Sequence, residues 1–71
     1  MSEKRKLRRA REAELKKQRD AITAIRTDLE SAYINFNSET DPSLTEAYIY
    51  EISALRARYD HAFQDLKHMF R

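Results

Sequence analysis

The chain has 71 residues, 37% of them charged, with one proline, no glycine and no cysteine. A single core in so short a chain rarely supplies more than about 3–5 kcal/mol, and without cysteine neither a disulfide nor a cysteine-bound zinc ion can add to it. Because tight hairpin turns and β-bulges usually need glycine, this composition predicts an all-α fold that self-association or a protein partner completes.

The first 19 residues are strongly basic. They hold nine Lys and Arg against three Glu, a net charge of +6, whereas residues 20–71 have a net charge of −4. We expect residues 1–14 to form a basic N-terminal extension that is only partly helical, since it contains few apolar residues. The cationic side chains either neutralise nucleic-acid phosphates or form a solubilising tail. They are Lys4, Arg5, Lys6, Arg8, Arg9, Arg11, Lys16, Lys17 and Arg19.

A heptad pattern begins at Leu15 and predicts a first helix with one face turned to a partner helix. Its members are Leu15, Gln18, Ile22, Ile25, Leu29, Ala32 and Phe36. We expect the helix to end near Phe36 or Asn37, because asparagine tolerates the left-handed conformation that often follows a helix. Residues 37–42 contain no apolar side chain other than the proline ring, which predicts a turn.

A second helix is predicted to begin between residues 41 and 44. Asp41 before Pro42 fits an N-cap followed by the first helical position, and Ser43 with Glu46 offers a competing capping box. The β propensity of Tyr48 to Tyr50 is the main argument for a strand instead. The heptad favours helix, with members Tyr48, Ile52, Leu55, Tyr59, Ala62, Leu66 and Met69.

The short connection makes the two helices antiparallel neighbours, so the fold class predicted for residues 15–71 is a coiled-coil-like α-hairpin. Facing positions should sum to about 81, given the heptad spacing and the turn. Leu29 then faces Ile52, Ile25 faces Leu55, and Ile22 faces Tyr59. Arg71 falls opposite Ala10, and the basic residues before Ala10 overhang the hairpin.

Three segments carry a resemblance to a known family. They are Thr40-Asp41-Pro42-Ser43-Leu44, Ala47-Tyr48-Ile49-Tyr50-Glu51-Ile52 and Leu55-Arg56-Ala57-Arg58-Tyr59. Over roughly residues 20–70 the chain resembles the YaaL-like small bacterial proteins, a family of unknown function. The resemblance implies a short two-helix protein, often encoded near a recombination-repair gene. It implies no catalytic or binding residue.

The heptad positions at which the two helices meet are here called the seam. Apolar residues beside this seam predict a protein interface. Two helices cannot cover a stripe that extends so far beyond the seam, and clustered exposed apolar residues usually mark such a surface. The residues predicted to bind a partner, or a second copy of the chain, are Ile49, Tyr50, Phe63 and Phe70. An aromatic set at helical spacing is more often core than a base-stacking platform.

Other site types find little support. His61 and His68 are two turns apart, about 10 Å, which is too far for one metal ion, although Asp65 could join either in a weak site. We expect no metal site, no cofactor, no small-molecule substrate and no enzymatic activity, because no nucleophile with a placed base and no glycine-rich phosphate loop is present. No apolar run approaches the roughly 18 residues of a membrane span, and the N-terminus does not look like a signal peptide, so we expect a cytoplasmic protein.

Two functions remain open from the sequence. We favour a small helical interaction module, an adaptor or self-assembling protein, that docks a protein through its apolar flank. The alternative is an electrostatic binder of nucleic acid or the ribosome that uses residues 4–19. An uncovered apolar flank lowers solubility, whereas a basic tail needs no partner, and this difference favours the module.

Overall fold

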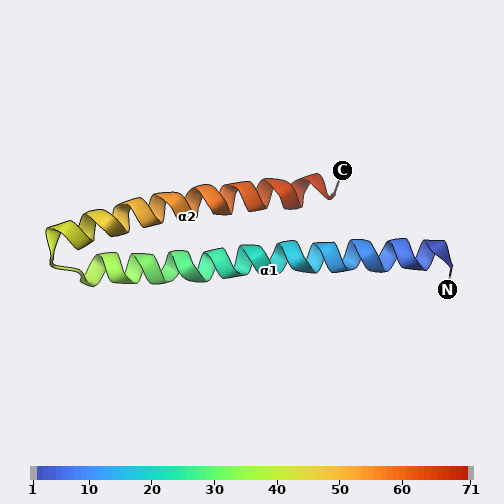
Figure 1. The fold of residues 1–71 in the computed structure, drawn as a ribbon, viewed down its shortest axis with the longest axis horizontal. Helices are drawn as coiled ribbons and strands as arrows, with labels where there is room; N and C mark the ends of the chain where they lie inside the picture. The colour runs from blue at the N-terminus through green and yellow to red at the C-terminus, as the bar shows by residue number, and fades with distance from the viewer. Residues whose placement is uncertain (1, 71) are drawn as a thin grey trace.

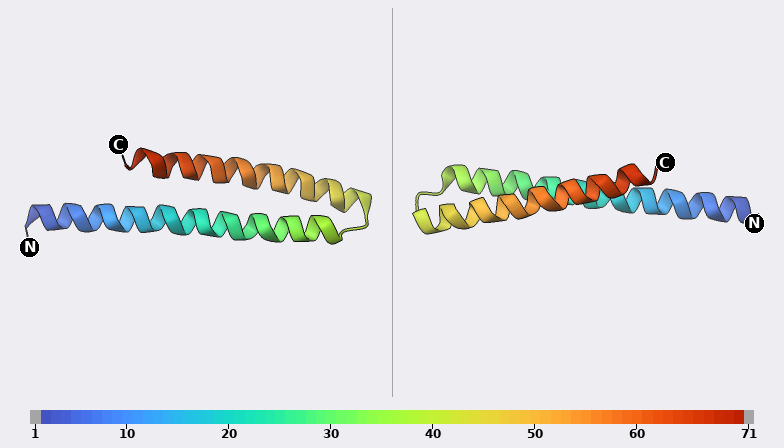
Figure 2. Two further views of the ribbon diagram at one scale, coloured as in Figure 1. Left: turned by 180° about the vertical axis from the view of Figure 1, so that it is seen from behind. Right: turned by 90° about the horizontal axis from the view of Figure 1, so that it is seen from above.

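The computed structural model describes residues 2–70 and contains two long helices joined by a short turn. Helix α1 spans Glu3–Ser38 and helix α2 spans Pro42–His68. They run antiparallel in a rod of 59 × 19 × 12 Å (Figure 1). Seen from above, the helices cross at a shallow angle, as in a coiled coil (Figure 2). The predicted all-α hairpin is confirmed, and residues 47–52 are helical rather than a strand.

The basic extension is helical from Glu3 onward, which corrects the expectation that residues 1–14 are only partly helical. The Ser2 hydroxyl caps the helix by accepting a hydrogen bond from the Arg5 backbone N–H at 3.3 Å. The following residues are mostly Lys, Arg, Glu, Ala and Leu, all strong helix formers, with no breaker among them. No break in α1 separates this extension from the residues that pack against α2.

The end of α1 lies at Ser38, slightly later than predicted, and Asn37 is helical. No residue of the described chain has a positive φ, so no left-handed cap forms. Side chains build the turn instead. The Ser38 hydroxyl donates to the Ile34 carbonyl at 3.1 Å, and the Glu39 carboxylate accepts the backbone N–H groups of Thr40 at 3.1 Å and Asp41 at 3.0 Å.

Helix α2 begins with the predicted Asp-Pro signal. Asp41 is the N-cap, and its carboxylate accepts the Ser43 backbone N–H at 2.8 Å. Pro42 occupies the first turn, where its missing N–H has no cost. The competing capping box does not form, because Ser43 already lies inside the helix.

The predicted seam holds the two helices together. In α1 the seven predicted seam positions are the only ones that are buried or half-buried, and in α2 only Thr45 joins the predicted set. Ile22, Ala32, Ile52, Leu55 and Ala62 are buried. Ile25, Leu29 and Phe36 pack against the cluster of Ala32, Ile52 and Leu55, in agreement with the predicted register.

The two helices differ in length, so part of α1 has no partner. At 1.5 Å per residue, the 36 residues of α1 span about 54 Å and the 27 residues of α2 about 40 Å. The N-terminal end of α1 extends past the end of α2 (Figure 1). Arg71, predicted to lie opposite Ala10, falls outside the described residues. Neither helix is long and apolar enough to cross a membrane.

Candidate interaction surface

One face of the hairpin, here called the groove face, carries apolar side chains that the seam does not bury. It consists of the residues that directly follow every second seam residue. Because the helices are antiparallel, the rows from both helices lie on the same side of the seam. The groove face comprises Arg19, Arg26 and Tyr33 of α1 and Ile49, Arg56, Phe63 and Phe70 of the second helix and its C-terminal end.

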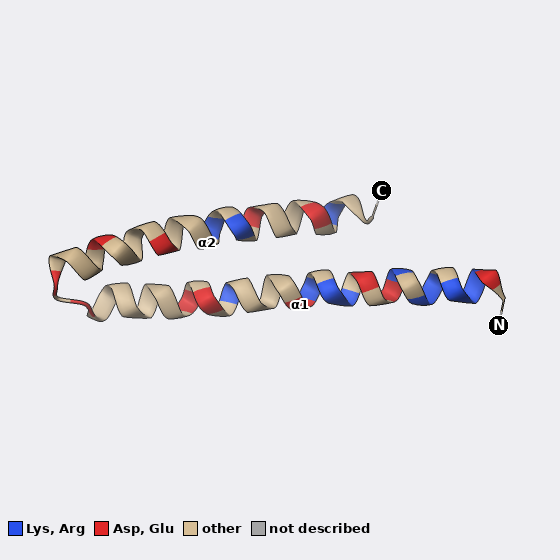
Figure 3. Ribbon diagram, viewed as in Figure 1, with Lys and Arg blue, Asp and Glu red and all other residues tan. Residues whose placement is uncertain are grey.

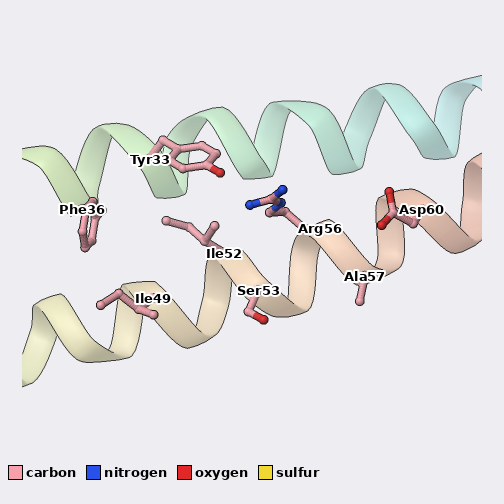
Figure 4. A pocket seen from close by; sticks show the side chains of 8 residues that line it. All are labelled: Tyr33, Phe36, Ile49, Ile52, Ser53, Arg56, Ala57 and Asp60. Atoms are coloured by element: carbon pink, nitrogen blue, oxygen red, sulfur yellow. The ribbon is translucent and has the colours of Figure 1, made fainter.

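A groove of about 550 Å³ runs along this face near the turn. Phe36, Ile52 and Arg56 lie in the space between the two helices, while Ile49 and Ser53 lie along α2 (Figure 4). The walls are mainly apolar, and the cation of Arg56 and the carboxylate of Asp60 lie at the end away from the turn. The lining residues are Tyr33, Phe36, Ile49, Ile52, Ser53, Arg56, Ala57 and Asp60.

Farther from the turn, the same face carries stacked aromatic rings with cations beside them. The rings of Tyr59 and Phe63 stack with their centroids 6.1 Å apart. The Arg26 guanidinium lies 5.9 Å from the Tyr59 ring and donates a hydrogen bond to its hydroxyl at 3.2 Å, and the Lys67 ammonium lies 5.3 Å from the Phe63 ring. The hydrogen bond to Tyr59 raises the pKa of Arg26 above its ordinary value. These contacts hold a cationic, aromatic surface in place.

The four residues predicted to bind a partner are all exposed, but they do not share one face. Ile49, Phe63 and Phe70 are 50%, 39% and 65% exposed and belong to the groove face. Tyr50 lies one position farther round α2, and its hydroxyl donates to the Glu46 carboxylate at 3.3 Å. The structure therefore groups three of the four and separates Tyr50.

Tyr33, Arg26 and Arg56 belong to the groove face although the sequence prediction did not assign them to the partner-binding surface. Their positions in the heptad are the signal that could have found them. Tyr33 and Arg26 each follow a seam residue of α1, as Ile49 and Phe63 do in α2. The antiparallel direction predicted from the short turn already places these flanking rows of both helices on one side of the seam.

The nine basic residues predicted to contact nucleic acid are all exposed along the N-terminal half of α1 (Figure 3). Lys4, Arg8 and Arg11 surround Leu7 on one side of the helix, and Leu7 is 70% exposed. In the described chain only Lys16 among the nine forms an ion pair, with Asp20 at 2.7 Å. The hydrogen bond from Lys16 to Asp20 raises the pKa of this lysine. The remaining cations are displayed to solvent.

The weak histidine and aspartate site that the sequence left as a minor alternative does not assemble within residues 2–70. The His61 imidazole and the Asp65 carboxylate are 3.4 Å apart, one turn apart on the surface of α2. No group of three potential ligands lies close enough to hold a metal ion among the described residues. This pair is an ordinary contact along a helix.

Comparisons with protein-family models, with curated proteins and with solved structures found no match for this chain. The resemblance to the YaaL-like proteins stays a prediction.

Proposed function

We propose that the protein is a small non-enzymatic interaction module that docks a protein surface through its groove face. The observation that carries the proposal is the row of Ile49, Phe63 and Phe70, which stays exposed beside a groove with mainly apolar walls. Exposed apolar residues arranged in this way are typical of binding sites for an amphipathic helix. A partner on this face would also complete the core, since no side chain of residues 2–70 is fully buried in the free hairpin.

The energetic gain from covering the face is substantial for so small a protein. Burying one large apolar side chain stabilises a complex by roughly 1.5–3 kcal/mol, before the entropy lost on association. The hairpin itself is expected to have only about 3–5 kcal/mol of stability from its core. The free energy gained by docking on the groove face is therefore comparable to the free energy of folding.

Replacing both Phe63 and Phe70 with glutamate tests the proposal. We expect the double variant to stay helical, because both side chains lie outside the seam, but to lose self-association and partner capture. Sedimentation at several concentrations and capture by the immobilised chain measure these losses, and circular dichroism measures the helix. The immobilised chain is treated with nuclease, so that proteins held through nucleic acid are removed.

A matched control adds the same charge away from the groove face. Ser43 of α2 and Thr27 of α1 are exposed residues outside this face, and their replacement with glutamate should leave association and capture intact. If the Phe63 and Phe70 variant associates and captures like the wild-type chain, the groove face is not the docking surface and the proposal is wrong.

A second candidate function is the binding of nucleic acid or the ribosome by residues 4–19. The overhanging end of α1 and its exposed cations favour it, because a protruding basic helix can approach a polyanion without bringing the net-negative hairpin close. Salt-sensitive binding that depends on this segment alone would distinguish this function from docking on the groove face.

A further inference from the structure

The face opposite the groove face, here called the acidic face, consists of the residues that directly precede every second seam residue, beginning with Leu15 in α1 and Thr45 in α2. All are exposed, and together they carry a net charge of −3. Several alanines, among them Ala24 and Ala54, flank this face and leave it smooth. The acidic face comprises Glu14, Ala21, Asp28 and Asn35 of α1 and Leu44, Glu51, Arg58 and Asp65 of α2.

The groove face has the opposite charge at its centre. Arg26 reaches Tyr59, and Arg56 lies three residues before Tyr59, so the two arginines are neighbours across the seam. Within the described chain neither arginine forms an ion pair with a carboxylate. Each arginine has an acidic residue one turn later on its own helix, Glu30 after Arg26 and Asp60 after Arg56, but neither carboxylate is close enough to form an ion pair. The two guanidinium groups therefore favour an occupant that brings carboxylates directly to the middle of the face.

Resting on the proposed function, we propose that the occupant of the groove face is the acidic face of a second copy of this chain. The copies stack in parallel, with α1 over α1 and α2 over α2. Each added copy leaves one groove face and one acidic face free, so the contact is heterologous and the stack can grow.

A single axial shift brings the charges into register. Asp28 lies two residues after Arg26 in α1, and Glu51 lies five residues before Arg56 in α2. Because the helices are antiparallel, both carboxylates are displaced toward the turn, by about 3 Å and 7.5 Å at 1.5 Å per residue. A shift of about 5 Å between copies, midway between these values, places both arginines opposite carboxylates.

The same shift matches other residues of the two faces. Ile49 comes opposite Leu44, and both are about half exposed in the free hairpin. Phe63 comes opposite Arg58, which suits an aromatic ring against a cation. The unfavourable pairs lie far from the turn, where α1 approaches the end of α2. There Phe70 comes opposite Asp65, and Glu12, one heptad before Arg19, comes opposite Glu14.

Pairing of two groove faces is less favourable. With the faces centred on one another, a twofold arrangement brings Arg26 and Arg56 of one copy against the same arginines of the other. Four guanidinium groups then meet with few carboxylates on the face to separate them, and like charges in an interface are strongly unfavourable. Charge complementarity therefore selects the stack over the symmetric dimer.

Charge exchange between the faces tests the stack by sedimentation of the purified full chain. For the wild-type chain we expect the average mass to rise with concentration beyond that of a dimer, and to fall at high salt. The variant with Arg26→Glu and Arg56→Glu, and the variant with Asp28→Arg and Glu51→Arg, should each associate about tenfold or more weakly. An equimolar mixture of the two should associate again, because each reversed face then meets a complementary one.

The quadruple variant with all four changes should associate alone, which separates charge matching from damage to the fold. Arg56→Glu and Glu51→Arg provide a milder pair, in case the loss of the Arg26 hydrogen bond to Tyr59 disturbs the hairpin. Circular dichroism of each variant checks that the helices are intact.

Three outcomes would overturn the stack: a wild-type chain that stays monomeric at every concentration, a mixture that fails to recover, or a discrete dimer indifferent to the reversals. The proposed function is judged separately. A monomeric wild-type chain that captures a protein, and loses it when Phe63 and Phe70 become glutamate, retains the docking function with a different occupant.

Discussion

Ala32 and Ala62 are two of the five buried residues of the seam, and their small side chains add little apolar area to the core. Larger buried side chains, Ile22, Ile52 and Leu55, therefore supply much of the stabilising burial. Leu55 is 6% exposed and belongs to the central cluster with Ala32 and Ile52. At the scale of single residues, stability is concentrated in a few seam positions.

Leu55→Ala should reduce the free energy of unfolding by about 2–4 kcal/mol, because it removes buried methyl groups and leaves a cavity. That loss is comparable to the whole stability expected of so small a core. Urea unfolding followed by circular dichroism at low protein concentration measures it without a contribution from association.

Leu7→Ala provides the matched control, because the same atoms are removed from a side chain that is 70% exposed. Its effect should stay within about 0.5 kcal/mol. Equal urea unfolding curves for the Leu55 variant and the wild-type chain would show that the seam contributes less to stability than its burial indicates.

At the scale of elements, α1 combines two segments with different roles. Its C-terminal part packs against α2 through the seam, and its N-terminal part carries most of the basic residues without a packed partner. The N-terminal part is held in helix by the Ser2 cap and by continuity with the packed part. A rigid connection of this kind would keep the cations projecting from the hairpin.

Reversal of Arg8 and Arg11 to glutamate should lower the salt concentration at which the chain elutes from heparin. Both side chains lie on one side of the overhang, and each lost phosphate-like contact reduces the dependence of binding on salt. Arg58 and Lys67, reversed together, make the matched control, since the total charge change is identical but lies in α2. Equal shifts for the two pairs would mean that net charge, not the basic segment, governs retention.

At the scale of the whole molecule, a two-helix layer has one seam and two open faces. The rod of 59 × 19 × 12 Å is only about one helix thick in its shortest direction, so the described residues 2–70 cover neither face. The faces differ in chemistry, since one is apolar and basic while the other is acidic and partly lined with small residues. Stacking of copies covers both faces through one type of contact.

The melting temperature should therefore rise with protein concentration, because association that occurs only in the folded state stabilises that state by mass action. The variant with Arg26→Glu and Arg56→Glu should melt at a temperature independent of concentration, and the quadruple charge-exchange variant should regain the dependence. Thermal scans by circular dichroism over a hundredfold range of concentration make the comparison. A wild-type melting temperature that does not move would contradict self-association through these faces.

The positions of the seam followed from the sequence by itself. In each helix the apolar residues recur at spacings of three and four that match the helical period, and the buried Ile22 of α1 and Ile52 and Leu55 of α2 belong to these two series. The start of α2 also followed from the sequence, since Asp41 and Pro42 set the first turn of the helix through local backbone interactions. The end of α1 was predicted nearly correctly, but the left-handed cap expected there does not form, because Ser38 and Glu39 stabilise the turn with side-chain hydrogen bonds instead.

The tertiary structure decided which of the flanking side chains line one groove. Tyr33 and Arg56 are 23 positions apart in sequence, and they line one groove because the antiparallel register brings their helices together. Tyr50 lies beside Ile49 in sequence, yet a rotation of about 100° per residue turns it away from that groove. Heptad spacing specifies which residues of each helix meet the seam, whereas the relative direction of the helices determines which flanking rows combine into a surface.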